Sequence, residues 1–262
     1  MKSSIKVIPL VIAGLWAAFN LSPVSAEEFN LEQMVQAGKR VKQVKSPKQY
    51  QLYHVTHPDT PNASQGPSHG PLFIKHPDGR IQQLADDIIY STISPSGNVF
   101  FSGYDLKLYT INSTGKVEHI ADNVSADFAF DKAGKRIVVS HPTDFIDSTL
   151  DIISADGKQI QHVLPEGNYF APTFTPDGNQ ILFASGDSGI VSWYIVNVDG
   201  SNKRQLTNIG METGNMTDDF VPVISTPENS GFIDDTHYKY MEGEDTWILD
   251  ITTGKAIRAG QK

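Results

Sequence analysis

Residues 183–194 read FASGDSGIVSWY, and Ser188 within Gly-Asp-Ser-Gly has the immediate neighbours of a nucleophilic serine. A serine nucleophile requires a histidine base, an acid that orients this base, and donors that hold the oxyanion. The histidines of the chain lie in predicted turns and strands without such partners around them. We therefore interpret residues 186–189 as a loop between two strands, and we predict no catalytic residue.

A second group of chemically capable side chains lies in four long, irregular segments, residues 57–70, 141–148, 210–220 and 234–245. Long loops on a rigid scaffold are frequent sites of function. Carboxylates, imidazoles and aromatic rings together suit a cation, a basic peptide or a sugar. The candidate residues of this ligand- or partner-binding face are His57, Asp59, His141, Asp144, Asp218, Asp219, Phe220, His237 and Tyr238.

Metal chemistry at this face depends on which of these side chains converge. Clusters rich in oxygen favour calcium, whereas histidine combined with carboxylate favours zinc or manganese. The chain has no cysteine, which excludes a thiol nucleophile and a cysteine-based zinc site. We expect no obligatory cofactor, and we keep the binding of a divalent cation as an alternative. The arrangement that a metal would need brings together His57, His141 and His237 with Asp144 or Asp219.

The elements that position these residues follow from a repeat of two turn signals that alternate along the chain. One is a tetrad containing proline or glycine, at residues 46–49, 94–97, 131–134, 175–178 and 226–229. The other ends in a glycine, and successive glycines are 36, 42, 43 and 54 residues apart. These glycines are Gly79, Gly115, Gly157, Gly200 and Gly254. Such a spacing is typical of a propeller blade of four strands.

Each repeat reads as four short strands, and the fourth repeat (169–209) shows the pattern best. Alternation places Ile181, Phe183, Tyr194 and Val196 on a face that packs against a neighbouring sheet. An Asp-Gly pair tolerates the positive φ of a tight hairpin. Stacking such sheets around an axis buries both of their faces. We predict an all-β fold, a five-bladed β-propeller of four-stranded antiparallel blades.

This topology sorts the connections to two ends of the molecule. The tetrads and the glycine hairpins share one end, and the four irregular segments lie at the other, which we call the loop-rich face. Asp86 and Asp87 precede a predicted inner strand, where they either border the channel mouth or cap a turn. The sequence RVKQV at 40–44 is interpreted as the inner strand of the first blade.

The fourth repeat resembles the repeat of the TolB-type β-propeller family. Matching positions include the turn Pro176, Asp177 and Gly178, with Pro172 and Phe174 before it. The hairpin residues Asp199 and Gly200 and the closing Leu206 match as well. The second and third repeats match in outline, and the first and fifth are degenerate. The resemblance covers about residues 41–262 and implies a lone propeller, without the N-terminal α/β domain that TolB carries.

The first 26 residues have the character of a secretory signal peptide. Lys2 and Lys6 form a basic start, residues 7–19 are apolar, and cleavage is expected after Ala26. The segment 27–40 follows with a short helix, in which Leu31, Met34 and Val35 share one face. The propeller then occupies 41–262. We expect the mature chain to be periplasmic or secreted and not to span a membrane.

Charge narrows the class of partner. The formal charge is −9, and removal of the two lysines of the leader makes it −11. An acidic domain of this kind argues against nucleic acid as a partner. We expect an exported, non-catalytic module that recognises a protein or cell-envelope component through the loop-rich face. The alternative is a propeller-type, metal-assisted lyase or hydrolase that acts on polysaccharide.

Overall fold

The computed structural model describes residues 40–44, 51–56, 70–103, 105–112, 115–125, 128–143, 147–188, 191–207, 230–242 and 245–260. All regular structure within these ranges is β-strand, and the prediction of an all-β chain is confirmed. The predicted helix at 27–40 lies outside the described residues except for Arg40, which begins the first strand.

The strands form one seven-stranded and three four-stranded sheets, in which every pair of neighbours is antiparallel. The first sheet runs β1 (Arg40–Val44), β2 (Gln51–Thr56), β3 (Gly70–Lys75), β4 (Ile81–Ile93), β5 (Val99–Gly103), β6 (Lys107–Ile111), β7 (Val117–Asp122). The second contains β8 (Phe128–Phe130), β9 (Arg136–Pro142), β10 (Ser148–Ser154) and β11 (Ile160–Gly167). The third contains β12 (Tyr169–Phe174), β13 (Gln180–Ser185), β14 (Ser192–Asn197) and β15 (Arg204–Gln205). The fourth contains β16 (Gly231–Phe232), β17 (His237–Glu242), β18 (Asp245–Asp250) and β19 (Ala256–Arg258).

The long strand β4 joins two sets of strands in the first sheet. Its first part pairs with β3, its second part pairs with β5, and Ile88 pairs with both Gly70 and Gly103. The register shifts on either side of this point. Asp86 and Asp87 therefore lie where β4 passes from one set of strands to the next.

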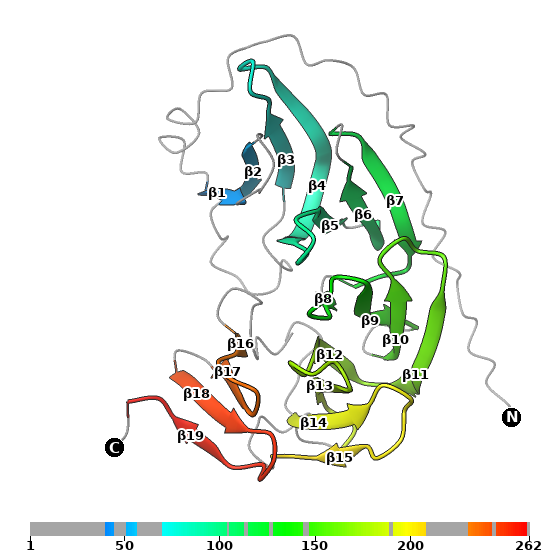
Figure 1. Cartoon of the computed structure of the whole chain (residues 1–262), viewed down its shortest axis with the longest axis vertical. Helices are drawn as coiled ribbons and strands as arrows, with labels where there is room; N and C mark the ends of the chain where they lie inside the picture. The colour runs from blue at the N-terminus through cyan, green and yellow to red at the C-terminus, as the bar shows by residue number, and fades with distance from the viewer. Residues whose placement is uncertain are drawn as a thin grey trace, which may run out of the picture.

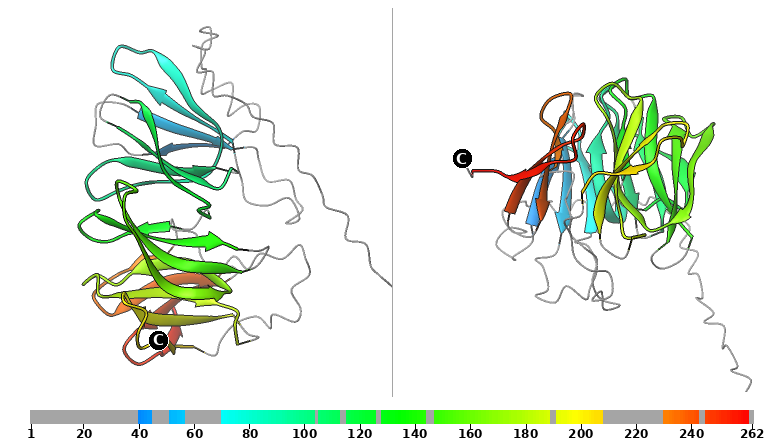
Figure 2. Two further views of the ribbon diagram at one scale, coloured as in Figure 1. Left: turned by 90° about the vertical axis from the view of Figure 1, so that its right-hand side faces the viewer. Right: turned by 90° about the horizontal axis from the view of Figure 1, so that it is seen from below.

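Figure 1 shows the sheets standing around a common centre. The short first strands β8, β12 and β16 lie nearest to it, and β7, β11, β15 and β19 lie at the perimeter. Figure 2 shows that the strands run between the same two ends of the molecule. Neighbouring sheets therefore meet face to face, and the first strands surround the common centre.

The core lies between the sheets. The four residues predicted for one face (Ile181, Phe183, Tyr194 and Val196) are buried together with Leu150, Ile152 and Tyr169, which confirms their placement. The alternate residues Leu182, Ala184, Trp193 and Ile195 are also buried, in a separate cluster with Tyr238, Tyr240 and Leu249. The third sheet thus buries both faces, as stacking requires.

The five repeated glycines all adopt positive φ, between 72° and 88°. Three of them also lie against the backbone of the preceding sheet. A Cβ atom at Gly157, Gly200 or Gly254 would overlap the carbonyl oxygen of Ile120, Val163 or Leu206, respectively. The hairpin glycines thus serve both the local turn and the close approach of sheets.

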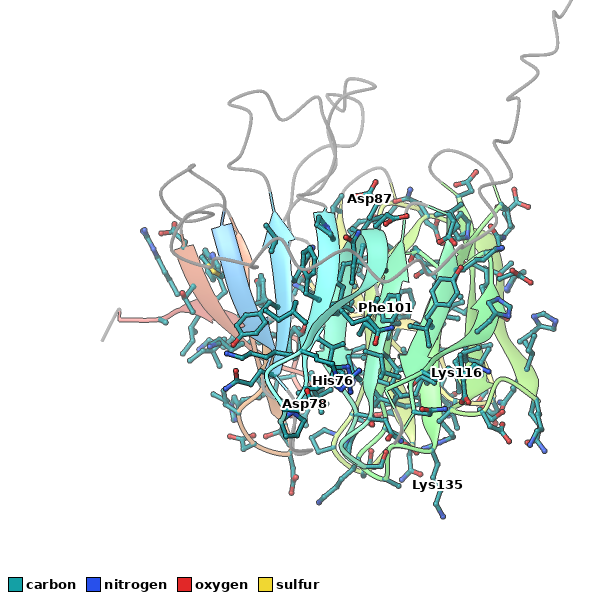
Figure 3. The ribbon with its side chains drawn as sticks, turned by 90° about the horizontal axis from the view of Figure 1, so that it is seen from above. His76, Asp78, Asp87, Phe101, Lys116 and Lys135 are labelled. Atoms are coloured by element: carbon teal, nitrogen blue, oxygen red, sulfur yellow. The ribbon has the colours of Figure 1, made fainter. Side chains whose placement is uncertain are left out.

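Figure 3 shows the two ends of the molecule. His76 and Asp78, from a glycine hairpin, lie toward the same end as Lys135, which follows a tetrad, and Asp87 lies toward the opposite end. This arrangement agrees with the predicted sorting of the connections. We call the end that carries His76, Asp78 and Lys135 the turn end.

One predicted turn is corrected. The tetrad 226–229 lies outside the described residues, and the connection between β16 and β17 is formed by residues 233–236. A hydrogen bond from Ile233 N to His237 O, 2.9 Å long, closes this turn. The equivalent turn of the third sheet is closed in the same way, by a bond of 2.9 Å from Thr175 N to Gln180 O. Residues 234–245 are therefore not one loop. They contain a turn at the turn end and the strand β17.

Candidate functional site: a central channel

The inner strands surround a cavity of about 270 Å³ at the centre of the molecule. Four sheets contribute to it, mainly through the first strand of each set of four, so the cavity belongs to the channel and not to any one sheet. The lining consists of Tyr90, Thr92, Ile93, Pro95, Phe128, Ala129, Phe130, Ala171, Pro172, Thr173, Ser230, Gly231 and Tyr238. Because Pro95 belongs to a turn between strands, the cavity extends toward the turn end.

Aromatic rings form much of the wall. The ring centroids of Tyr90 and Phe128 are 5.0 Å apart at an angle of 67°, and those of Phe128 and Phe130 are 6.2 Å apart at 83°. Tyr238 meets Trp193 and Phe232 edge to face, at 5.2 and 5.1 Å. Such edge-to-face contacts hold rings in defined orientations, and the wall is therefore built before any ligand arrives.

The strand β12 bends where it borders this cavity. Its register with β13 shifts between Phe170 and Thr173, and Ala171 has a φ of 50°. A residue with a Cβ rarely adopts this conformation, which costs about 1–2 kcal/mol. Backbone strain of this kind is concentrated at functional sites. The bend turns Ala171, Pro172 and Thr173 toward the channel.

The described lining provides alkyl groups, aromatic rings and the hydroxyl groups of threonine, serine and tyrosine. Such groups are able to pack against the apolar surface of a ligand and to exchange hydrogen bonds with it. The chemistry at this cavity therefore suits binding of an apolar or aromatic segment that carries a few polar groups.

A separate polar cluster lies between the first and second sheets, nearer the loop-rich face. Asp151 of β10 is fully buried, and it accepts hydrogen bonds from His141 Nδ1 at 2.7 Å and from His162 Nδ1 at 2.5 Å. Thr149 Oγ1 donates to the same carboxylate at 2.6 Å. The side chain of His141 is 15% exposed and that of His162 is 82% exposed. One buried carboxylate thus orients two imidazoles of different accessibility.

Burial by itself would raise the pKa of Asp151, but the bonds from His141, Thr149 and His162 outweigh it. They hold the pKa of this carboxyl below its ordinary value of 3.8. An ionised carboxylate only accepts hydrogen bonds, so both Nδ1 atoms carry the proton. The Nε2 atom of each ring is then left as an acceptor whenever the ring is neutral.

The structure describes three of the nine predicted site residues, His141, His237 and Tyr238. His57, Asp59, Asp144, Asp218, Asp219 and Phe220 lie outside the described residues. His141 lies near the end of β9, at the loop-rich face, where the prediction placed it. Tyr238 is 3% exposed, and it borders the channel from within the core.

The placement of His237 at the loop-rich face is corrected. His237 begins β17 at the turn end, where its Nδ1 contacts the carboxylate of Asp234 at 2.9 Å. Since β9 and β17 are both second strands and run in the same direction, His141 near the end of one and His237 at the start of the other lie at opposite ends. The predicted convergence of these two histidines does not occur.

Residues 186–188 lie in the connection between β13 and β14, which confirms the interpretation of Gly-Asp-Ser-Gly as a loop. The carboxylate of Asp187 accepts a hydrogen bond from Asn168 N at 2.8 Å. It also forms an ion pair with Lys203 at 3.1 Å. Asp187 thus ties this loop to the start of β12 and to the outer edge of the same sheet.

Several residues of both sites were not identified from the sequence. Asp151 leaves one signal, a single carboxylate between Leu150 and Ile152 in the strand β10. Tyr90, Phe128 and Phe130 belong to strands that were predicted, but the cavity that they share has contributions from residues as distant as Gly231. No spacing in the sequence reveals such a contact.

Among the described residues, no group of three or more histidine, aspartate or glutamate side chains is arranged to hold a metal ion. They also contain no helix with the length and apolar character needed to cross a membrane.

No protein-family model and no curated protein matches the chain. Solved structures do match. A putative TolB from Agrobacterium tumefaciens superposes with a TM-score of 0.54 at 17% identity, covering 83% of this chain and 79% of that one. TolB from Acinetobacter baumannii superposes with a TM-score of 0.52 at 13% identity, covering 92% and 74%.

A gluconolactonase from Xanthomonas campestris superposes about as well, with a TM-score of 0.52 at 9% identity, covering 84% of this chain and 76% of that one. Identities this low establish the fold alone. The chain has a TolB-like β-propeller fold, as its repeat predicted. Because an enzyme matches as well as the TolB proteins do, the activity must be argued from this chain's own sites.

Proposed function

We propose that this TolB-like β-propeller is an exported, non-catalytic module that binds a protein or cell-envelope component. The basic and apolar leader ending at Ala26 supports export to the periplasm or the exterior. The five repeated glycines support five blades if the seven-stranded sheet counts as two blades that share β4. The segment 27–40 then precedes a propeller over 41–262.

The observation that carries the proposal is the aromatic channel cavity. A volume of about 270 Å³ suits one or two side chains of a partner and not a whole domain. Rings held in place by edge-to-face contacts lose little freedom when they pack against a ligand. We therefore propose that a partner rests on the propeller and inserts a short apolar or aromatic segment between Tyr90, Phe128 and Phe130.

Recognition at the loop-rich face is the second part of the proposal. The residues expected to contribute there are His57, Asp59, His141, Asp144, Asp218, Asp219 and Phe220. In this arrangement the partner covers the loop-rich face, and its apolar or aromatic segment enters the channel. The net charge of the mature chain favours a neutral or basic partner over nucleic acid.

The test fills the channel without removing a contact. Thr173→Trp places a large ring into the cavity, whereas Gln159→Trp adds the same ring at an exposed position of the second sheet. We expect a partner captured from envelope extract and then purified to bind the wild-type chain and Gln159→Trp equally. Thr173→Trp should weaken its binding by about tenfold or more. Equal affinity of all three chains would refute the channel as the binding site.

The alternative function, metal-assisted cleavage of polysaccharide, is favoured by one observation. Asp151 holds the Nδ1 atoms of His141 and His162, and a carboxylate in this position commonly orients the other ring nitrogen toward a metal ion. Zinc and manganese are the ions that such ligands prefer.

Metal analysis and cleavage assays distinguish this alternative. If it holds, the purified chain retains stoichiometric zinc or manganese, and EDTA abolishes its cleavage of polysaccharide. His141→Ala should then lose both metal and activity. Cleavage that persists in EDTA, or an absence of cleavage in the metal-loaded chain, would reject it.

A further inference from the structure

A second cavity, of about 350 Å³, lies in the first sheet beside the bend of β4. We call it the acidic slot. It is separate from the channel, since no described residue lines both cavities. Its inner wall is apolar and includes Leu84, Ile88 and Phe101, which are 3% exposed or less. Both Asp87 and Phe101 line the slot, and Figure 3 shows Asp87 nearer the loop-rich face than Phe101.

Two aromatic rings complete this wall. Phe101 and Tyr109 stack with centroids 5.3 Å apart and an angle of 21° between their planes. His119 meets Tyr109 edge to face at 5.7 Å. The slot therefore offers the π-face chemistry that attracts organic cations as well as apolar groups.

Three carboxylates border the opening: Asp86, Asp87 and Asp105. Asp86 and Asp87 lie in β4 near its bend, and Asp105 lies in the connection between β5 and β6. Gly103 brings these two segments together. A Cβ atom at Gly103 would lie 3.0 Å from both the Asp105 carboxylate and the Asp87 carbonyl. Among the described lining residues, His119 is the only candidate for positive charge, and it contacts Asp122 at 3.1 Å.

The acidic groups are oriented by the protein. Asp105 accepts a hydrogen bond from the Tyr109 hydroxyl at 2.5 Å and another from Lys107 N at 3.2 Å. Gln83 Nε2 donates to Asp86 at 2.7 Å. Burial and the Asp105 carboxylate raise the pKa of Tyr109 far above its ordinary value, so its hydroxyl stays a donor. A carboxylate held in this way keeps its charge directed at the slot.

We propose that the acidic slot binds an arginine side chain presented by a peptide segment. The alkyl stem would pack on the apolar wall, and the guanidinium would lie near the Phe101–Tyr109 stack within reach of the carboxylates. A guanidinium is planar, weakly hydrated and rich in donors, which suits this combination better than a compact, strongly hydrated ammonium. A bare metal ion, which prefers oxygen ligands, would gain nothing from the apolar and aromatic wall.

The test compares two small probes on the wild-type chain. N-acetylarginine methylamide carries the charged group, and N-acetylcitrulline methylamide has the same shape without the charge. We expect the arginine probe to shift the backbone amide resonances of Asp87, Gly103 and Tyr109. The citrulline probe should bind with an affinity lower by about tenfold or more. Equal binding of both probes, or shifts confined to other parts of the chain, would overturn the proposal.

Variants provide an independent check. Asp105→Asn keeps the side-chain shape and should reduce arginine binding by about tenfold. Asp199→Asn removes the same charge from an exposed hairpin at the turn end and should leave binding unchanged. If both variants weaken binding equally, the effect is one of net charge and the slot is rejected. This outcome is independent of the channel proposal, because the probes need no partner protein.

Discussion

Replacing Gly200 by alanine is expected to destabilise the protein by about 3 kcal/mol or more. Two costs add together. The residue has a φ of 82°, which an alanine adopts only with strain. Its Cβ would also overlap the carbonyl oxygen of Val163 in the neighbouring sheet. Backbone atoms cannot move aside as a flexible side chain can, so the two sheets would have to separate locally.

The matched control is Gly79→Ala. Gly79 has a φ of 88°, but nothing lies within 4 Å of the position of its Cβ. This variant bears the conformational cost alone, and we expect it to lose about 1 kcal/mol. Urea unfolding followed by tryptophan fluorescence measures both. Similar losses in the two variants would show that the contact between sheets carries no energy.

The same comparison extends to Gly157, whose Cβ would overlap the carbonyl oxygen of Ile120. A loss in Gly157→Ala similar to that in Gly200→Ala is expected, because each glycine lies against the outer strand of the preceding sheet. A common effect at both positions would explain why this glycine recurs. It would be the residue that sets how closely neighbouring sheets approach.

This second role marks the limit of what the sequence predicts. The strands and hairpins are local features, and their alternation and turn residues are sufficient to predict them. Ile181 and Tyr194 are buried where alternation places them. The contact of Gly200 with Val163 joins two repeats, and nothing in either repeat signals it.

The misplaced turn in the last sheet has a different cause. Residues 226–229 carry the proline of a tetrad, whereas the turn at 233–236 contains neither proline nor glycine. Here the carboxylate of Asp234 accepts hydrogen bonds from the backbone amides of Thr236 and His237, both at 2.8 Å. The side chain of Asp234 thus stabilises this turn, whereas proline or glycine marks the turns in the other repeats. A prediction based on proline and glycine therefore misses this turn and places His237 at the wrong end of the molecule.

The candidate sites were less predictable than the fold. Ala171, Pro172 and Thr173 border the channel where β12 bends, and the bend coincides with a register shift between β12 and β13. The two histidine partners of Asp151 come from the strands on either side of β10, 10 and 11 residues away in the sequence. Selecting the polar residues of predicted loops identifies His141, but it does not identify Asp151, the buried strand residue that orients His141.

The buried carboxylate of Asp151 is expected to contribute strongly to stability. Asp151→Ala is expected to lower the free energy of unfolding by about 3 kcal/mol. The substitution leaves a cavity beside β9 and removes the acceptor of three hydrogen bonds. His162 can turn to solvent, whereas the mostly buried Nδ1–H of His141 would lose its partner without replacement. A buried donor left in this state is costly.

Two histidine variants separate the contributions. His141→Ala and His162→Ala each remove one donor from the same carboxylate, so they differ in burial and not in bond partner. We expect His162→Ala to change stability by about 0.5 kcal/mol or less, as exposed positions usually do. His141→Ala should cost about 2 kcal/mol. Equal effects would mean that burial does not decide the strength of this cluster.

The pH dependence tests the charge itself. The pKa of Asp151 in the folded chain lies below its ordinary value of 3.8, so its ionised form favours folding. This contribution is fully present well above 3.8 and is lost as the pH falls through the lower, folded-state value. Asp151→Asn keeps the shape without the charge, and the stability difference from wild type should therefore be larger at neutral pH than in strong acid. Denaturant unfolding of both chains along this pH range measures the difference, and a difference that grows toward acid would mean that the carboxylate is protonated in the folded protein.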